Sequence, residues 1–339
     1  MSNADTMIWC CPTCHSSLDL VDTDLRCKSC QVRYPVIHDI PDLRVTLECW
    51  IDLDEDRERA REAADRVARD GLESAIRHIF RSSRGMNEKK ADYRTRQVLA
   101  GVEKCQSQCS DWLQPALEAN GVILEIGCGP GQLLAAAATR NCEVAGVDVS
   151  MEWLVIARHL IEHYGGSPKL AAGFAERLPI ADGLVAAIVS LDVIEHVGDQ
   201  NAYVNELRRV LRPGGFFALS TPNRYSLSPE PHVNVWGVGY LPRSLQARYV
   251  KFVRNQSYTF TRLLSVRDTK RLFSGPKGFE ARIVFPVIPE QEISNFTTSK
   301  KRLALIYNWL VDIPLVKLFL PFFGAYYRVW KVTKVWCAC

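Results

Sequence analysis

A short glycine-rich stretch constrains the fold of this chain more than any other feature. Residues 122–126 read Val-Ile-Leu-Glu-Ile, a mostly apolar run typical of a buried parallel strand. Gly127, Gly129 and Gly131 follow at alternate positions, and residues 132–138 have high helix propensity. Because glycine tolerates positive φ and lets the backbone approach closely, a ligand can lie across such a turn and the helix N-terminus. The order of strand, glycine turn and helix predicts the ligand-binding turn of a doubly wound α/β fold.

The chain after residue 121 alternates further apolar runs with helical stretches, which predicts a mostly parallel sheet. The Pro213-Gly214 turn marks the passage from a helix into the fifth strand. We therefore expect a Rossmann-like α/β fold with seven strands, the terminal strand antiparallel. The predicted strands are 122–126, 143–148, 169–172, 184–190, 216–220, 279–285 and 325–332.

Two acidic residues accompany the turn. Glu125 lies two residues before the first glycine, and Asp148 ends the second strand, 17 residues after Gly131, near the offset at which a carboxylate takes ribose hydroxyls. The spacing Glu-x-Gly-x-Gly-x-Gly differs from the dinucleotide fingerprint and resembles the first motif of the class I S-adenosylmethionine (SAM)-dependent methyltransferases. The resemblance implies that the turn faces the methionine end of SAM. It implies cofactor contacts from Glu125, Gly127, Cys128, Gly129, Gly131, Asp148, Val149, Leu191 and Asp192.

One position departs from that family. After Gly173 the family usually has an acid that contacts the adenine amine, whereas this chain has Phe174. We therefore expect the adenine contact from backbone groups near Ala175 and from Glu176, with Phe174 stacking or filling space.

The segment after the central strand, 191–197, holds the candidate general base. Open α/β sheets place chemistry at the carboxyl ends of strands beside the ligand crevice. Neutral imidazole accepts a proton near pH 7, so His196 is the candidate base. The alternative is a structural role for Glu195 and His196 in holding the loop.

Four cysteines near the N-terminus have the spacing of a metal site. Cys11 and Cys14 form one Cys-x2-Cys pair, and Cys27 and Cys30 form another. Four thiolates close a tetrahedral zinc site and leave no open position for catalysis. An iron–sulfur cluster and a metal-free relic are the alternatives. The following residues, 34–43, resemble the end of small Trm112-like zinc ribbons, which often precede or partner methyltransferases.

These features predict three parts: a zinc ribbon over 1–45, a helical linker and lid over 46–118, and the methyltransferase domain over 119–339. In related methyltransferases, helices before the first strand cover the mouth of the active site. Residues 52–70 carry eight acids and five arginines, which predicts a solvated helix with charged faces. Two insertions interrupt the methyltransferase domain, at 222–265 and 290–322.

The insertion 222–265 lies where loops carry substrate contacts. Its pattern resembles small-molecule methyltransferases of the ubiquinone-pathway type, in which this region forms the acceptor pocket. Residues 240–271 contain eight basic residues and one acid, which favours an acceptor with phosphate or carboxylate, or an anionic surface; a solvated basic helix is the alternative. The candidate acceptor-binding residues are Asn223, Tyr225, His232 and Trp236.

Residues 303–323 are very apolar, but Asp312, Pro314, Lys317 and Pro321 interrupt the run, which argues against a spanning helix. The segment 300–323 is a candidate for a peripheral membrane contact, a cap on an apolar acceptor pocket or a homodimer contact.

Composition narrows the compartment and the partners. A net charge of +4 is too weak on its own to indicate nucleic acid. Twelve cysteines, four of them in metal spacing, and the absence of a signal-peptide pattern fit a reducing cytoplasm. The resulting hypothesis is a cytoplasmic SAM-dependent methyltransferase that acts on O, N or C of a small-molecule acceptor, in the biosynthesis of a metabolite or natural product. A zinc-ribbon rRNA or tRNA methyltransferase and a non-catalytic SAM-fold partner protein are the alternatives.

Overall fold

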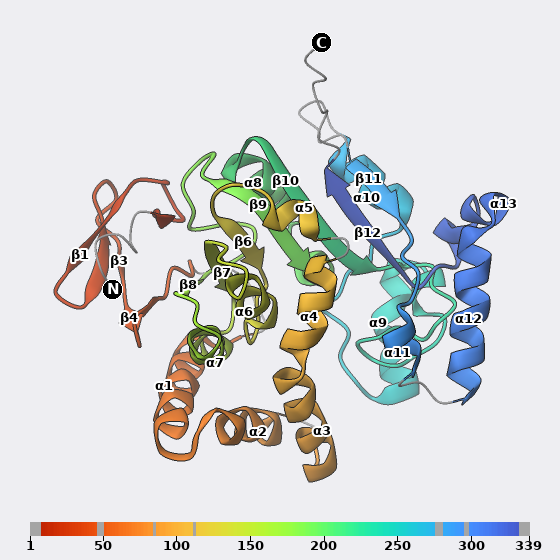
Figure 1. Ribbon diagram of the computed structural model, residues 1–339, viewed down its shortest axis with the longest axis horizontal. Helices are drawn as coiled ribbons and strands as arrows, with labels where there is room; N and C mark the ends of the chain where they lie inside the picture. The colour runs from red at the N-terminus through yellow and green to blue at the C-terminus, as the bar shows by residue number, and fades with distance from the viewer. Residues whose placement is uncertain are drawn as a thin grey trace. The chain divides into compact units, whose positions relative to one another are not determined.

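The computed structural model describes residues 8–45, 51–83, 86–110, 113–274, 281–294 and 298–331 (Figure 1). The predicted strand residues 279, 280 and 332, and the predicted domain limits at 1, 46 and 339, lie outside these ranges.

A seven-stranded sheet organises the chain, with the strand order β11-β12-β10-β9-β6-β7-β8. Strand β6 pairs in parallel with β7 and β9, and β7 pairs in parallel with β8. Strand β12 is antiparallel to both β10 and β11. The predicted α/β fold, with a mostly parallel sheet and an antiparallel strand near the C-terminal end, is confirmed. The strands are β6 (Ile123–Ile126), β7 (Val144–Asp148), β8 (Lys169–Ala172), β9 (Val185–Leu191), β10 (Leu211–Pro222), β11 (Ala281–Val284) and β12 (Tyr326–Lys331).

Strand β10 begins five residues before the predicted start at 216. Its first residues include Pro213 and Gly214, which are exposed, and Gly214 has a φ of +76°. The apolar run that predicted this strand covers only its buried part, so hydrophobicity could not locate the solvated beginning.

The chain packs as two compact units. The first comprises Met1–Ser190 and Asn201–Phe217, and the second comprises Leu191–Gln200 and Ala218–Cys339. The first unit starts with short strands, β1 (Leu18–Val21), β2 (Asp24–Cys27), β3 (Arg33–Tyr34), β4 (Val36–Ile37) and β5 (Ile40–Pro41). Its helices are α1 (Leu53–Asp70), α2 (Leu72–Ser82), α3 (Glu88–Leu99), α4 (Gly101–Ser110), α5 (Gln114–Leu117), α6 (Gln132–Ala138), α7 (Met151–His163) and α8 (Gln200–Val210).

Within the first unit, the N-terminal strands and helices pack directly on the Rossmann-like part. The Leu43 N–H donates to the Ala172 carbonyl at 2.9 Å, which continues the chain beside the end of β8. Helix α1 packs against α7, and α4 packs against α6. All four residues of β6 are buried, as its apolar sequence requires.

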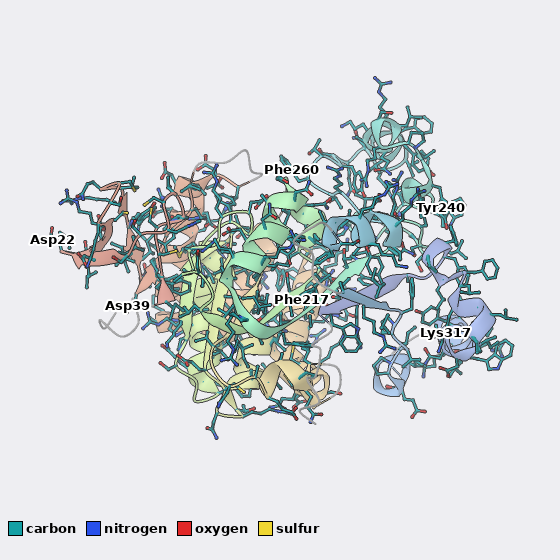
Figure 2. The ribbon with its side chains drawn as sticks, turned by 90° about the horizontal axis from the view of Figure 1, so that it is seen from above. Asp22, Asp39, Phe217, Tyr240, Phe260 and Lys317 are labelled. Carbon is teal, nitrogen blue, oxygen red and sulfur yellow. The ribbon has the colours of Figure 1, made fainter. Side chains whose placement is uncertain are left out.

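The second unit contains the insertions and the C-terminal strands. Its helical elements are η2 (Ile194–His196), η3 (Val238–Tyr240), α9 (Arg243–Arg254), α10 (Val266–Phe273), α11 (Glu290–Ser294), α12 (Thr298–Asp312), α13 (Pro314–Lys317) and η4 (Leu320–Phe322). Across the described ranges, every helix is too short or too polar to cross a bilayer. Figure 2 labels side chains from this unit, among them Tyr240, Phe260 and Lys317.

Candidate functional site

The turn between β6 and α6 uses the backbone freedom of its three glycines. Gly127, Gly129 and Gly131 have φ values of +72°, +47° and +75°, which L side chains rarely adopt. A Cβ on Gly131 would lie 2.8 Å from the Cβ of Ala157, so this glycine lets α6 approach α7 closely. A Cβ on Gly129 would meet no atom within 4 Å. The turn therefore presents bare backbone to open space at Gly129.

Asp148 holds the turn from the end of β7. One carboxylate oxygen, Oδ2, accepts from the Gly129 N–H at 2.7 Å, and the other, Oδ1, accepts from the Ser150 N–H at 2.9 Å. Burial raises the pKa of Asp148, although these backbone donors partly oppose the shift. The side chain thus fixes the Gly129 backbone, and its contact to ribose hydroxyls stays a prediction.

Glu125 lies inside β6 with a carboxylate that the described residues leave partly unsatisfied. The residue is 6% exposed, and its Oε2 is buried without a hydrogen-bond partner among the described residues. Burial raises the pKa of Glu125 well above its ordinary value, and the nearby Asp148 raises it further. Such a carboxylate is stabilised by a cation that brings hydrogen-bond donors. The α-ammonium group of SAM supplies both the charge and the donors, so the buried Glu125 carboxylate fits this cofactor.

A buried ion-pair network, which no sequence pattern indicates, lies next to this site. Arg44 donates to both carboxylate oxygens of Asp42 at 2.7 Å, and its Nη1 donates to Asp56 Oδ2 at 2.5 Å and to the Val149 carbonyl at 2.8 Å. Asp56 in turn accepts from the Met151 N–H at 2.8 Å, at the start of α7. The network therefore joins the N-terminal strands, α1 and the residues that follow Asp148.

The acid-rich segment 52–70 forms a helix as expected, but it is not solvated on every side. Asp56 is 0% exposed, together with buried alanines of the same face. Because acids and arginines are so frequent in this segment, the sequence does not distinguish Asp56, which pairs with the buried Arg44, from the exposed acids.

The helices before β6 reach the start of α6. Gln132 Nε2 donates to the Val98 carbonyl at 2.8 Å and to the Gln97 carbonyl at 3.3 Å, at the end of α3. The Cys105 thiol on α4 is close enough to Glu125 that this carboxylate adds to the effect of burial, and the pKa of Cys105 rises to about 12. These contacts put α3 and α4 beside the glycine turn, and their role as a lid stays a prediction.

The remaining predicted cofactor residues fall in both units. Cys128 is buried under the turn, Phe174 is buried, and Ala175 and Glu176 are half-buried after β8. Leu191 and Asp192 belong to the second unit. Their roles as cofactor contacts stay predictions.

A second group of polar side chains gathers within the second unit, at the end of β9 and in the insertion. Glu195 is 0% exposed, and its Oε2 accepts from Thr221 Oγ1 at 2.9 Å. Its Oε1 has no hydrogen-bond partner in the part of the chain that the structure describes, and it lies 3.9 Å from His232 Nε2. The ring of His196 meets the ring of His232 edge-on, with centroids 4.5 Å apart. We call Glu195, His196 and His232 the His–Glu cluster.

Each imidazole of the His–Glu cluster is held through Nδ1. His232 Nδ1 lies 2.5 Å from Glu230 Oε1, and His196 Nδ1 lies 3.3 Å from the carbonyl oxygen of Phe260, which is labelled in Figure 2. Burial lowers the pKa of His232, but the hydrogen bond to Glu230 and the negative charges of Glu230, Glu195 and Asp192 together outweigh burial, and the net shift is upward. Burial, followed by the neighbouring His232, lowers the pKa of His196, so this ring is neutral near pH 7.

The structure places the four candidate acceptor residues in three different settings. His232 joins the His–Glu cluster, whereas the Asn223 amide is 1% exposed and donates to the carbonyls of Pro321 and Gly324. The rings of Tyr225 and Trp236 both lie near that of Tyr240, with centroids 5.7 and 6.3 Å from it. Trp236 Nε1 also donates to a backbone carbonyl, that of Leu227, at 3.0 Å. The acceptor roles of all four residues stay predictions.

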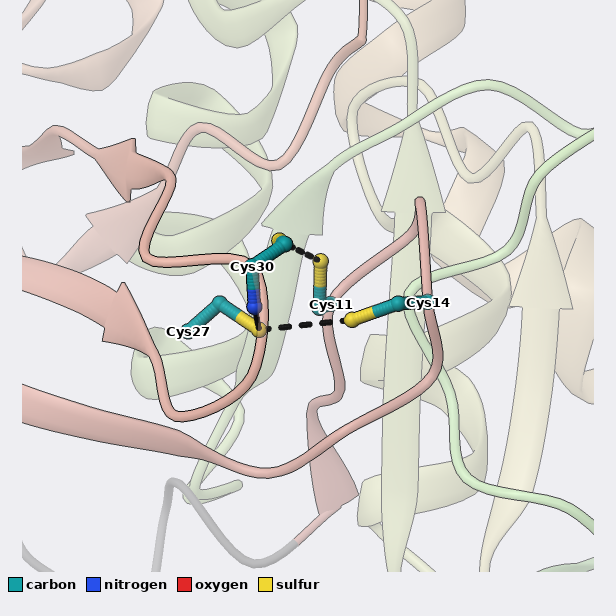
Figure 3. A group of neighbouring side chains, drawn as sticks. All are labelled: Cys11, Cys14, Cys27 and Cys30. Atoms are coloured by element: carbon teal, nitrogen blue, oxygen red, sulfur yellow. Dashed lines mark hydrogen bonds between the residues drawn. The ribbon is translucent and has the colours of Figure 1, made fainter.

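The four predicted metal ligands come together in the N-terminal strands (Figure 3). Cys11 Sγ lies 3.5 Å from Cys30 Sγ, and Cys14 Sγ lies 3.4 Å from Cys27 Sγ. All four sulfur atoms lie within 4.8 Å of one another. Thiolates around one tetrahedral zinc ion are separated by about 3.8 Å, given Zn–S bonds of about 2.3 Å. The cluster therefore fits a zinc ion, and the likeness of residues 34–43 to Trm112-like ribbons stays a prediction.

Comparison with known proteins supports the resemblance to methyltransferases that the glycine turn suggests. Residues 124–219 match the model of a family described as a methyltransferase domain. A probable S-adenosylmethionine-dependent methyltransferase of Mycolicibacterium smegmatis is 41% identical over 110 residues, which cover 32% of this chain and 40% of that protein. A ubiquinone biosynthesis O-methyltransferase of Cereibacter sphaeroides is 32% identical over 146 residues, covering 43% of this chain and 56% of that protein.

These matches thus span about half, or less, of the length of the curated relatives. Among solved structures, an S-adenosylmethionine-dependent methyltransferase from Mesorhizobium loti is similar with a TM-score of 0.45 and 18% identity, covering 66% of this chain and 98% of that one. The similarity to methyltransferases is thus carried by residues 124–219 of this chain.

Proposed function

We propose that this protein transfers the methyl group of SAM to a small-molecule acceptor. The observation that carries the proposal is the bare glycine turn with the unpartnered, buried Oε2 of Glu125 beside it. The family match over residues 124–219 supports the same cofactor. When bound, SAM supplies an electrophilic methyl group on a sulfonium sulfur.

The chain contributes binding and orientation. Glu125 accepts hydrogen bonds from the ammonium group, and the open backbone at Gly129 lets the methionine part lie against the turn. Asp148 receives the ribose hydroxyls while it holds the Gly129 N–H. Ala175 and Glu176 take the adenine edge, with Leu191 and Asp192 as further contacts. Orientation of this kind can supply a large part of a methyl-transfer barrier.

The acceptor approaches residues of the insertion 222–265. Its proton leaves at the His–Glu cluster, where His196 Nε2 is the available base because Nδ1 faces the Phe260 carbonyl. An acceptor hydroxyl is the preferred nucleophile, since curated relatives include ubiquinone biosynthesis O-methyltransferases. The basic helix α9 and its neighbours favour an anionic group on the acceptor.

Binding of S-adenosylhomocysteine tests the cofactor proposal. We expect calorimetry to show one molecule bound per chain, and Asp148→Asn to weaken binding by about tenfold, or about 1.4 kcal/mol, because a charged acceptor of hydrogen bonds is lost. Asp182→Asn is the matched control, since Asp182 is an exposed acid of the same unit that pairs with Arg209. No binding by the wild-type protein would refute the proposal, and transfer from labelled SAM to phenolic acceptors tests the reaction.

We also propose that Cys11, Cys14, Cys27 and Cys30 bind one structural zinc ion. The described cysteines form no disulfide, which supports a reducing, cytoplasmic compartment. Elemental analysis is expected to find one zinc per chain, and Cys27→Ser to lose it with a fall in melting temperature, because a closed four-thiolate site contributes folding energy. Cys142→Ser, at a cysteine outside the cluster, is the control. If wild-type protein stripped of zinc melts at the same temperature as the untreated protein, this assignment is wrong.

The apolar segment 300–323 is proposed as a contact with an anionic membrane or a second copy of the chain. Leu303, Trp309, Leu315 and Phe319 are at least 60% exposed. Exposed apolar groups at this density mark interaction surfaces. Sedimentation with anionic vesicles, set against light scattering without them, distinguishes the two partners, and a negative result in both would reject the segment as a contact.

A further inference from the structure

The His–Glu cluster has the composition and placement of a metal site. Glu195, His196 and His232 each offer one ligand atom, and these atoms all lie within 4.8 Å of one another. Glu195 and His196 lie in η2, and His232 comes from the insertion 222–265 of the same unit. We propose that these three side chains bind a divalent transition-metal ion.

The hydrogen bonds at Nδ1 of the two imidazoles orient the rings as metal ligands. His232 Nδ1 is engaged by Glu230 and His196 Nδ1 by the Phe260 carbonyl, which leaves Nε2 of each ring as the free nitrogen. Metal-binding histidines typically donate their other N–H to a carboxylate or a backbone carbonyl in this way. Both kinds of support are present here, one on each ring. Glu230 is itself held, because its Oε2 accepts from the backbone N–H groups of His232 and Val233.

The buried carboxylate supplies an independent reason for a cation. Glu195 is fully buried, and Thr221 satisfies only Oε2. Its Oε1 has no hydrogen-bond partner among the described residues, and it faces His232 Nε2 at 3.9 Å. A buried carboxylate oxygen without a partner is costly. An ion between Oε1 and the two Nε2 atoms would remove that cost.

The dimensions and chemistry of the site select the class of ion. Ligand atoms arranged tetrahedrally around one ion at about 2.1 Å lie about 3.4 Å apart, and those of the cluster lie within 4.8 Å of one another, so the cluster needs to contract by up to about 1.4 Å. Two imidazoles and one carboxylate suit Fe²⁺, Mn²⁺, Co²⁺ or Zn²⁺. Three protein ligands leave positions open for a bound oxygen. The exposed edges of His196 and His232 give that oxygen access.

The open position gives the ion a role that rests on the proposed methyl transfer. An acceptor hydroxyl bound to the cation becomes more acidic and releases its proton to water. The resulting oxygen anion forms the new O–C bond while the C–S bond breaks, and the sulfur leaves as a neutral thioether. His196 is then a metal ligand, and its part as a base is confined to the ion-free protein.

Binding of Mn²⁺ to protein loaded with only one equivalent of zinc, which the cysteine cluster takes up, tests the site directly. Thiolates prefer zinc over Mn²⁺, so the cysteine cluster does not interfere. We expect electron paramagnetic resonance to show one Mn²⁺ per chain, and His196→Gln and His232→Gln each to weaken its affinity by at least about tenfold. His159→Gln, which changes a partly exposed histidine outside the cluster, is expected to leave Mn²⁺ affinity unchanged.

The outcomes separate this site from the proposed function. The site is rejected if wild-type protein loaded with only one equivalent of zinc binds neither Mn²⁺ nor Co²⁺, or if both histidine variants bind Mn²⁺ as well as wild type does. Because His196 is exposed, His196→Gln is not expected to disturb folding, and retained S-adenosylhomocysteine binding would show that it has folded. Mn²⁺ binding without S-adenosylhomocysteine binding would uphold the metal site and refute the methyl transfer.

Discussion

Arg44→Met is expected to destabilise the protein by about 3–5 kcal/mol, the usual cost of removing one partner from a buried ion pair. The side chains of Arg44 and Asp42 are 0% exposed and that of Asp56 is 1% exposed, so water cannot replace the lost guanidinium. Urea denaturation at neutral pH measures the change in the free energy of unfolding. Methionine keeps much of the volume of the arginine stem, so the loss reports on charge and hydrogen bonds.

Arg57→Met is the matched control for this prediction. Arg57 also contacts Asp42 at 2.7 Å, but its side chain is 25% exposed, so we expect a loss of about 1 kcal/mol or less. If the two variants lose the same free energy of unfolding, burial of the Arg44 ion pairs does not add to stability as predicted.

The same variant has an expected pH signature. Burial raises the pKa of Asp42, but the hydrogen bonds and charges of Arg44, followed by those of Arg57, together outweigh burial, and the net shift is downward. A carboxyl whose folded pKa is depressed adds stability above its unfolded pKa and loses it as pH falls through the folded pKa. The gap in stability between wild type and Arg44→Met should therefore narrow on acidification below about pH 4.

The network around Arg44 also marks where sequence reasoning stops. The glycine turn, the strand alternation and the two Cys-x2-Cys pairs are local patterns, and each predicted its element because spacing alone determines which atoms face one another. Arg44 instead bonds the Val149 carbonyl, 105 positions away. The side chain of Asp56 is indistinguishable by sequence from the exposed acids around it. Only the packing of α1 on α7 selects that acid for burial.

The His–Glu cluster likewise could be predicted from the sequence only in part. His196 stands out in the sequence because it follows the central strand, and His232 because it lies in the predicted acceptor insertion. Their mutual approach, and the support from Glu230 and the Phe260 carbonyl, depend on how the insertion folds back. No periodicity in residues 222–265 encodes that return, so the sequence could name the residues without grouping them.

Glu125→Gln is expected to separate cofactor binding from stability. We expect affinity for S-adenosylhomocysteine to fall by about 10- to 100-fold, or about 1.4–2.8 kcal/mol, because a hydrogen-bonded charge pair with the ligand's ammonium becomes a neutral contact. The ligand-free variant should be at least as stable as wild type at neutral pH. Burial, with the nearby Asp148, raises the pKa of Glu125, and a group whose folded pKa is raised loses its favourable contribution as pH rises through that pKa.

The pH dependence of binding completes this test. The ligand's ammonium favours ionised Glu125, so wild-type affinity should rise with pH from the ordinary glutamate range up to the raised pKa of the free protein, and binding should release a proton. Calorimetry in two buffers of different ionisation enthalpy measures that proton. Glu143→Gln, at an exposed acid beside β7, should keep the proton release, whereas Glu125→Gln should abolish it. A Glu125→Gln protein that loses stability but keeps its affinity would assign Glu125 to the core of the fold, and the ammonium contact would have to lie elsewhere.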